Sequence, residues 1–225
     1  MTKNLEYDKA VKMRKEGKSY SDILSQVHVS KSTLSRWLQN IPLSSDAIIR
    51  LNSVKKMKIE RYRNTMNTQR EEKLRGYYND AKKIIYPLSS RELYLAGLFL
   101  YWGEGSKTVR HTVSINNTDP SLVQFALKWY IQSLKIPRNK IKVMLHLYTD
   151  MDKSREMTYW SKILEIPLSQ FLNPHIKQSL RRELSQKSFG HGTCGLMAYD
   201  TIVKEKILMA LKVISDQSKK EMSFI

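Results

Sequence analysis

The chain has 225 residues, of which 41% are hydrophobic and 9% aromatic, a globular rather than a disordered composition. Its 39 lysines and arginines against 21 acidic residues give a formal net charge of +18. We therefore expect a polyanionic partner, and nucleic acid before a membrane surface. The one cysteine, Cys194, excludes an internal disulfide, and no Cys/His spacing indicates a zinc site.

The N-terminus has no apolar segment typical of a signal peptide, and no apolar run reaches the ~20 residues that cross a bilayer. We therefore expect a soluble, cytoplasmic protein that is associated with the nucleoid and has no membrane partner. The length favours two units of unequal size over one small domain.

The first 40 residues predict three short helices. Gly17 is placed to end the first, a serine precedes the second, and Ser30 is the expected N-cap of the third. The segment VHVS, which ends at Ser30, has the length of the turn in a helix-turn-helix. In the third helix Leu34 and Trp37–Leu38 are expected to face the core. The residues expected to face outward are Lys31, Ser32, Thr33, Ser35 and Arg36.

The stretch EGKSYSDILSQVHVSKSTLSRWLQ resembles the helix-turn-helix of resolvases and of transposase-associated DNA-binding domains. In that motif the helix after the turn enters the major groove of duplex DNA. The resemblance implies that the five outward residues contact bases and phosphates. The alternative is a solvated helical hairpin without a ligand. We predict a helix-turn-helix DNA-binding domain over residues 1–43.

Residues 44–88 predict a basic helical connector. Eleven basic and four acidic residues lie between Arg50 and Lys83. Such a run is either a solvated helical face or a segment along the DNA backbone, where each neutralised phosphate adds salt-dependent affinity. Its apolar residues are too sparse for a separate core, so we expect the connector to pack on a neighbouring domain or a second subunit.

Residues 89–225 predict an α/β domain. An apolar helix over 93–102 comes first, and a segment through Val113 and Ile115 alternates as strand. An amphipathic helix begins at Asp119, and a second strand alternates over 141–148. A further helix, a basic irregular segment, a strand through Cys194 and a closing helix follow. The expected fold is α+β, with the order α-β-β-α-β-β-α in this domain.

The stretch LYLAGLFLYWGEGSK, which begins at Leu93, carries a second resemblance. Its letters LAGL begin the motif of LAGLIDADG homing endonucleases, GEG is a common ending of that motif, and VSINNTDPSLVQFALKWY is similar to the strand and helix that follow it. When GEG is aligned with the end of the motif, Glu104 takes the place of the terminal acid, whereas Trp102 replaces the earlier acid. The resemblance implies that Glu104 is the catalytic residue and the ligand of Mg²⁺ or Mn²⁺.

The chain has one copy of the motif, so the resemblance implies a homodimer in which two motif helices meet at a two-fold axis. The residues expected at this interface are Ala96, Gly97, Leu100 and Gly103. Each helix would then end in Glu104, where the helix dipole and the second carboxylate both disfavour negative charge. We therefore expect a positive group there, and a divalent cation would satisfy this need. The alternative is a core helix whose Glu104 only points to water.

The LAGLIDADG resemblance also implies that the polar faces of the strands lie over a DNA groove and that a basic segment contacts phosphates. An ordinary solvent-facing side is the alternative for each strand residue. The residues expected to contact DNA in this domain are Arg110, Thr112, Ser114, Lys142, His146, Lys177, Arg181, Arg182 and Lys187.

The predicted function is site-specific, metal-dependent cleavage of phosphodiester bonds in double-stranded DNA by a homodimeric endonuclease of the LAGLIDADG type. The alternative, which Trp102 favours, is a transcriptional regulator that keeps the LAGLIDADG fold without cleavage and binds DNA through its helix-turn-helix. A recombinase or transposase accessory factor is a third class, supported by the helix-turn-helix alone.

Overall fold

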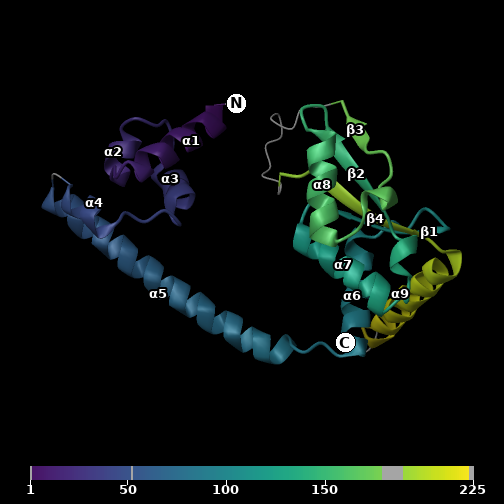
Figure 1. The fold of residues 1–225 in the computed structure, drawn as a ribbon. Coiled ribbons are helices and arrows are strands. Elements are labelled where there is room, and N and C mark those ends of the chain that lie inside the picture. Colours follow the sequence, from purple (N-terminus) through teal and green to yellow (C-terminus); the bar gives the residue numbers. More distant parts are fainter. Residues whose placement is uncertain (1, 52, 179–189, 223–225) are drawn as a thin grey trace. The chain divides into compact units, whose positions relative to one another are not determined.

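The computed structural model describes residues 2–51, 53–178 and 190–222 (Figure 1). The chain divides into two compact units, Met1–Tyr86 and Pro87–Ile225, each with its own buried core. Pro87 explains the position of this division, because a proline disfavours helical geometry in the residue before it. Tyr86 accordingly has extended backbone angles. Among the described residues no helix is both long and apolar enough to cross a membrane.

The regular secondary structure described in the N-terminal unit consists of helices joined by short turns. The three short helices expected in the first 40 residues are present, and Ser19 and Ser30 cap the second and third through their side chains. Gly17 follows the first helix with φ of +88°, a conformation that favours glycine. The helices of this unit are α1 (Thr2–Lys15), α2 (Tyr20–Leu24), α3 (Lys31–Leu38), α4 (Ser45–Ile49) and α5 (Val54–Ile85).

The buried carboxylate of Glu60 joins α5 to the helices before it. Glu60 is 1% exposed and accepts hydrogen bonds from Arg14 Nη2 at 2.8 Å, Arg63 Nη1 at 2.9 Å and the backbone N–H of Tyr20 at 3.4 Å. Arg14 also donates to the backbone carbonyl of Ile41 at 2.9 Å. The expected boundary after residue 43 therefore does not divide two units, because the N-terminal half of α5 is part of the same packed unit.

Loss of the Glu60 charge should destabilise the N-terminal unit. In Glu60→Gln, two guanidinium groups lose their shared carboxylate in a buried site, and we expect a loss of about 3 kcal/mol in the free energy of unfolding. The matched control is Glu72→Gln, which makes the same substitution at an exposed carboxylate of the same helix and should change stability little. Chemical denaturation followed by circular dichroism measures both. Equal stability of the two variants would contradict the role given to Glu60.

The C-terminal unit combines a mixed four-stranded sheet with helices, so the expected α+β class is confirmed. The sheet order is β1-β4-β2-β3, in which β4 is antiparallel to β1 and β2, and β3 is parallel to β2. The elements are α6 (Ser90–Glu104), β1 (Thr112–Asn117), α7 (Pro120–Gln132), β2 (Lys142–Tyr148), α8 (Lys153–Leu164), β3 (His175–Lys177), β4 (Thr193–Tyr199) and α9 (Thr201–Met222), with short 3₁₀ turns at Arg138–Lys140 and Leu168–Gln170.

The order α-β-β-α-β-β-α is wrong at its first strand pair. Between α6 and β1 only an isolated bridge forms, from Gly105 to Ile115. The carbonyl of the next residue, Ser106, accepts hydrogen bonds from the side chains of Tyr101 and Lys204 instead of entering a strand ladder. The segment expected to be irregular contains the short strand β3, and α8 lies between β2 and β3 in the chain.

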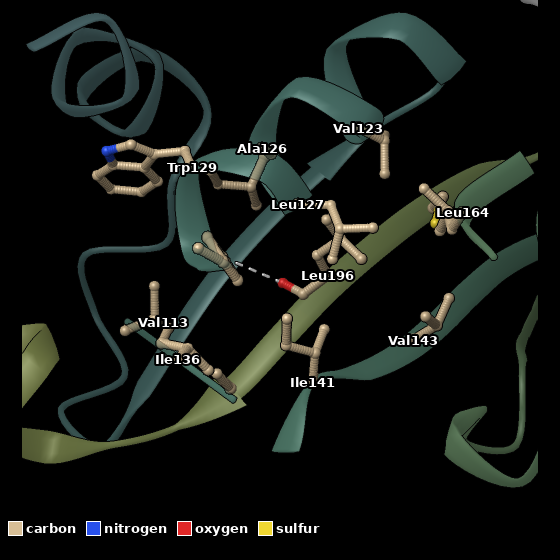
Figure 2. Close-up of a cluster of buried hydrophobic side chains, with 14 of the residues drawn as sticks. Val113, Val123, Ala126, Leu127, Trp129, Ile136, Ile141, Val143, Leu164 and Leu196 are labelled. Atoms are coloured by element: carbon tan, nitrogen blue, oxygen red, sulfur yellow. Dashed lines mark hydrogen bonds between the residues drawn. The ribbon is translucent and has the colours of Figure 1, made fainter. Parts of the chain in front are cut away.

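The core of this unit lies between one face of the sheet and the helices (Figure 2). Val143 and Leu196 from the sheet, Leu127 and Trp129 from α7, and Leu164 from α8 are all buried there. The strand alternation expected over residues 141–148 is confirmed, because β2 alternates between buried and half-buried residues. The opposite face of β2 carries Lys142, Met144, His146 and Tyr148, all of them half-buried.

Candidate nucleic-acid interface

Helix α3 has one buried side and one polar, exposed side. The packing of the buried side holds the helix in place. Leu34 and Leu38 are 0% and 1% exposed, and Trp37 packs edge-on against Tyr7, with ring centroids 5.4 Å apart. Ser30 Oγ accepts the backbone N–H of Thr33 at 3.2 Å and thereby fixes the first turn. The expected outward residues that are exposed are Lys31, Ser32, Ser35 and Arg36.

Thr33 differs from the other four expected contacts of α3. It is half-buried, and its hydroxyl accepts a hydrogen bond from Ser30 Oγ at 2.9 Å. Its side chain is therefore engaged in the N-terminal cap. The Ser32 hydroxyl also lies 2.9 Å from Ser30 Oγ, but Ser32 is exposed, as are Lys31, Ser35 and Arg36. Beside the start of α3 lies a cavity of about 230 Å³ that Lys31, Lys56 and Arg63 help to line. Of these three basic groups, Lys56 is paired with Asp22 and Arg63 with Glu60, which also lines the cavity.

Glu104 is exposed at the last position of α6. The described residues contain no group of three or more His, Cys, Asp or Glu side chains that could hold a metal ion. Mg²⁺ in phosphoryl-transfer sites is held by one or two carboxylates together with substrate phosphates. One Glu104 carboxylate therefore fits such an ion only when DNA, or DNA and a second copy of the chain, supplies the other ligands.

The C-terminal end of α6 already carries positive groups. Lys107 Nζ donates to the carbonyl oxygen of Trp102 at 2.6 Å. Lys204, which is 0% exposed, donates to Tyr101 Oη at 2.5 Å and to the carbonyl of Ser106. These lysines satisfy carbonyl groups at the negative end of the helix dipole. The need for a positive group beside Glu104, which we assigned to a divalent cation, is met in part by the protein itself.

Lys204 and Tyr101 were not among the expected functional residues. Burial raises the pKa of the Tyr101 phenol to about 12. Burial, and then the charge of Lys107, lowers the pKa of Lys204. The sequence held one signal for Lys204: it is a lysine three residues before Ile207 and seven before Leu211, on the buried stripe of α9. Its hydrogen bonds fix the turn that directly follows Glu104.

Gly97 does not lie at a surface available to a partner helix, contrary to our expectation. A Cβ atom on Gly97 would come within 2.0 Å of the Trp129 ring on α7. The indole of Trp129 is buried and donates to the carbonyl of Tyr94 at 3.2 Å. Gly97 is therefore a close contact between two helices of the same chain. Leu100 is half-buried and packs partly on the same core.

The exposed side of α6 is apolar. Phe99 and Trp102 are 54% and 41% exposed, and their rings stack with centroids 6.1 Å apart. Ala96 is half-buried, and Gly103 is exposed, with open space for 4 Å around the position that a Cβ atom would take. Of the expected interface residues, Ala96 and Gly103 thus lie beside this exposed pair.

Two of the expected DNA contacts on β1 are buried. Thr112 is 4% and Ser114 6% exposed. The strand register pairs Thr112 with Tyr199 and Ser114 with Met197, so larger side chains of β4 stand beside these small ones on the same face. The alternation of β1 correctly predicted which face of the sheet carries these residues, but not how deeply they are buried. Direct contact of these two hydroxyls with DNA is not supported by their burial.

Lys142, His146 and Lys177 lie on the less buried part of the sheet. Lys177 is exposed, with its ammonium group 5.4 Å from the centre of the Tyr148 ring. His146 lies beside His175, with ring centroids 5.5 Å apart. Burial, followed by the charges of His175 and Lys177, lowers the pKa of His146. This histidine is therefore uncharged at neutral pH, and the two lysines provide the positive charge of the face.

The remaining expected contacts are separate from this face or outside the described residues. Arg110 is exposed and forms an ion pair with Glu205 at 3.2 Å. Arg181, Arg182 and Lys187 lie in residues 179–189, outside the described part of the chain. His191, which sequence reasoning did not select, holds the buried carboxylate of Glu156 at 2.6 Å and stacks on Tyr159.

Comparisons of the chain with protein-family models, with curated proteins and with solved structures found no match. The two resemblances therefore remain expectations. The functional proposal rests on the geometry of α3, of the end of α6 and of the sheet face that carries Lys142, His146 and Lys177.

The two glycines of α6 provide a matched pair of substitutions. Gly97→Ala forces a methyl group into the buried Trp129 ring, and we expect the C-terminal unit to lose about 2 kcal/mol or more of stability. Gly103→Ala adds the same methyl group in open space within the same helix and should not lower stability. Thermal unfolding followed by tryptophan fluorescence compares them. Equal melting of both variants would contradict the assignment of Gly97 to the α6–α7 contact.

Proposed function

We propose that the protein binds double-stranded DNA sequence-specifically, with α2, the turn and α3 acting as a helix-turn-helix. The observation that carries this proposal is the division of α3 into a buried side and an exposed side of Lys31, Ser32, Ser35 and Arg36. Arginine and lysine donate to guanine edges and phosphates, and serine hydroxyls donate to or accept from either. The net charge of +18 supports a polyanionic partner.

The anchoring of the helix supports recognition rather than unspecific attraction alone. The Glu60 cluster ties α1 and the start of α2 to α5, while Leu34 and Leu38 seat α3 on the same unit. A helix held in this way keeps its exposed side chains in a fixed arrangement. Fixed placement lowers the ordering cost of binding, and it lets a base sequence be distinguished from its neighbours.

Substitution on α3 tests this proposal. In Lys31→Ala/Arg36→Ala, we expect affinity for a selected duplex to fall and sequence preference to relax, since each bidentate base contact discriminates by about 1–3 kcal/mol. The control is Lys162→Ala/Lys212→Ala, which removes the same charge from the C-terminal unit. Selection from a randomised duplex pool, followed by titration at fixed salt, measures both. The same preferred sequence and affinity in wild type and the α3 variant would reject the proposal.

A second candidate function, cleavage of the bound DNA, is favoured by the exposed carboxylate of Glu104. Glu104 from one copy or from each of two copies would hold Mg²⁺ or Mn²⁺ together with DNA phosphates. The bound metal would supply an activated water for phosphodiester hydrolysis. Tyr101 and Lys204 hold the turn after Glu104, and Lys107 satisfies a carbonyl of the last helical turn. A regulator that binds without cutting uses the same DNA contacts and needs no metal.

Glu104→Gln separates cleavage from regulation. The substitution keeps the shape of the side chain and removes its charge, so cleavage should be lost, while affinity for DNA without metal stays level or rises. Glu165→Gln, which changes another exposed carboxylate of the same unit, is the control. Nicking of supercoiled plasmid in Mg²⁺ and in Mn²⁺ is the measurement. A wild-type protein that binds DNA but nicks it with neither metal would assign the protein to regulation.

A further inference from the structure

The C-terminal half of α5 carries an apolar stripe with no cover. Every residue from 71 to 86 is exposed. Large side chains are included: Tyr77 is 61%, Tyr78 68% and Ile84 85% exposed. The apolar residues recur at spacings of three and four, so they lie on one face of the helix. We call them the α5 stripe: Leu74, Tyr77, Tyr78, Ala81, Ile84 and Ile85.

A partner is needed to account for this stripe. Helices are stabilised mainly by packing of an apolar face, and isolated segments of this length are marginal in water. Gly76 lies within the segment, has nothing within 4 Å of its Cβ position, and lowers helix propensity further. Contiguous exposed apolar side chains of this kind mark interaction surfaces. In the N-terminal half of α5, by contrast, Glu60 contacts Arg14 of α1, and Asn64 donates to the carbonyl of Leu43 between α3 and α4.

We propose that the α5 stripe binds the α5 stripe of a second copy of the chain, with the two helices antiparallel. In this orientation the charged residues beside the stripe of one copy lie opposite residues of the other charge in the second copy. With a two-fold axis near Tyr77, Lys73 of each copy comes opposite Asp80 of the other on one flank. On the other flank Glu71 comes opposite Lys82. Ala81 comes opposite Leu74, and Tyr77 lies beside its own copy at the axis. Ile84 and Ile85 come opposite Arg70 and Gln69, so the paired segment extends to residue 69.

A parallel pair in register does not give these contacts. Identical residues then lie at the same height, so that Lys73 and Asp80 of the two copies are separated by about 10 Å along the axis. The pattern thus selects the antiparallel arrangement, in the way that flanking charges set orientation in coiled coils. An unrelated protein partner would not require the charges to be complementary to themselves.

The inference goes beyond the proposed function and does not depend on DNA binding. If α3 contacts DNA as proposed, pairing through α5 brings two α3 helices into one symmetric particle, the arrangement with which helix-turn-helix dimers bind two half-sites. The surface also differs from the exposed side of α6, where Phe99 and Trp102 lie. Variants of the two helices can therefore be compared directly.

Sedimentation of the full chain without DNA, at about 0.15 M salt, tests the pairing. We expect a dimer for wild type and a monomer for Leu74→Asp/Tyr77→Asp, with self-association weakened about 100-fold or more because four carboxylates would be buried near the two-fold axis. The control Thr68→Asp/Asn79→Asp adds the same charge to the opposite face and should remain dimeric, as should Phe99→Asp on α6. A monomeric wild type, or a dimer that Phe99→Asp breaks and Leu74→Asp/Tyr77→Asp does not, would overturn the proposal.

A charge exchange tests the orientation of the two helices. Because the double variant should restore the dimer, it also distinguishes a lost contact from a misfolded chain. Lys73→Glu alone should weaken the dimer, because it places like charges opposite Asp80, and Lys73→Glu/Asp80→Lys should restore it. Circular dichroism confirms that helix content is kept. Failure of the double variant to restore the dimer would overturn the antiparallel arrangement. Since DNA is absent throughout, a dimer that does not bind DNA would reject the proposed function and leave this inference standing.

Discussion

The buried ion cluster around Glu60 is the constraint on which the N-terminal unit depends. The carboxylate of Glu60 is 1% exposed, and Arg14 and Arg63 donate hydrogen bonds to it, which offsets the cost of burying the group. Arg14 comes from α1, so α5 cannot leave α1 without exposing unpaired charge. The start of α2 is drawn in through the Tyr20 backbone. The exposed side of α3 therefore has a fixed frame, whereas residues 71–86 of α5 lie outside these contacts and are exposed.

Local signals predicted most of the secondary structure, because the interactions that start and end helices lie within a few residues. Ser30 capping α3 and Gly17 following α1 are examples. Long-range partners were not predictable in the same way. Glu60 stands in a basic helical run, and nothing near it identifies Arg14, 46 residues away, as its partner. Lys204 likewise finds Tyr101 across 103 residues of sequence.

The candidate site on the C-terminal unit was predicted only in part, for a related reason. A small residue in an apolar helix indicates close approach of another helix, but not which helix approaches. Gly97 meets Trp129 of its own chain, whereas Gly103 remains open. Alternation along β1 placed Thr112 and Ser114 on the polar face correctly, yet the neighbours that bury them belong to β4 and follow from the register. How deeply a residue is buried depends on such neighbouring strands and helices. The periodicity of a sequence does not identify these neighbours.

The end of α6 shows how this changes the chemistry assigned to one residue. From sequence, Glu104 at the negative end of a helix dipole called for a cation, and a divalent metal was the natural choice. In the structure Lys107 and Lys204 approach the carbonyls of Trp102 and Ser106. These ammonium groups offset the dipole in part, so some of the positive charge expected beside Glu104 comes from the protein itself. Metal binding at Glu104 therefore depends on what DNA and a second chain bring to it, whereas the surface of α3 is complete within one chain.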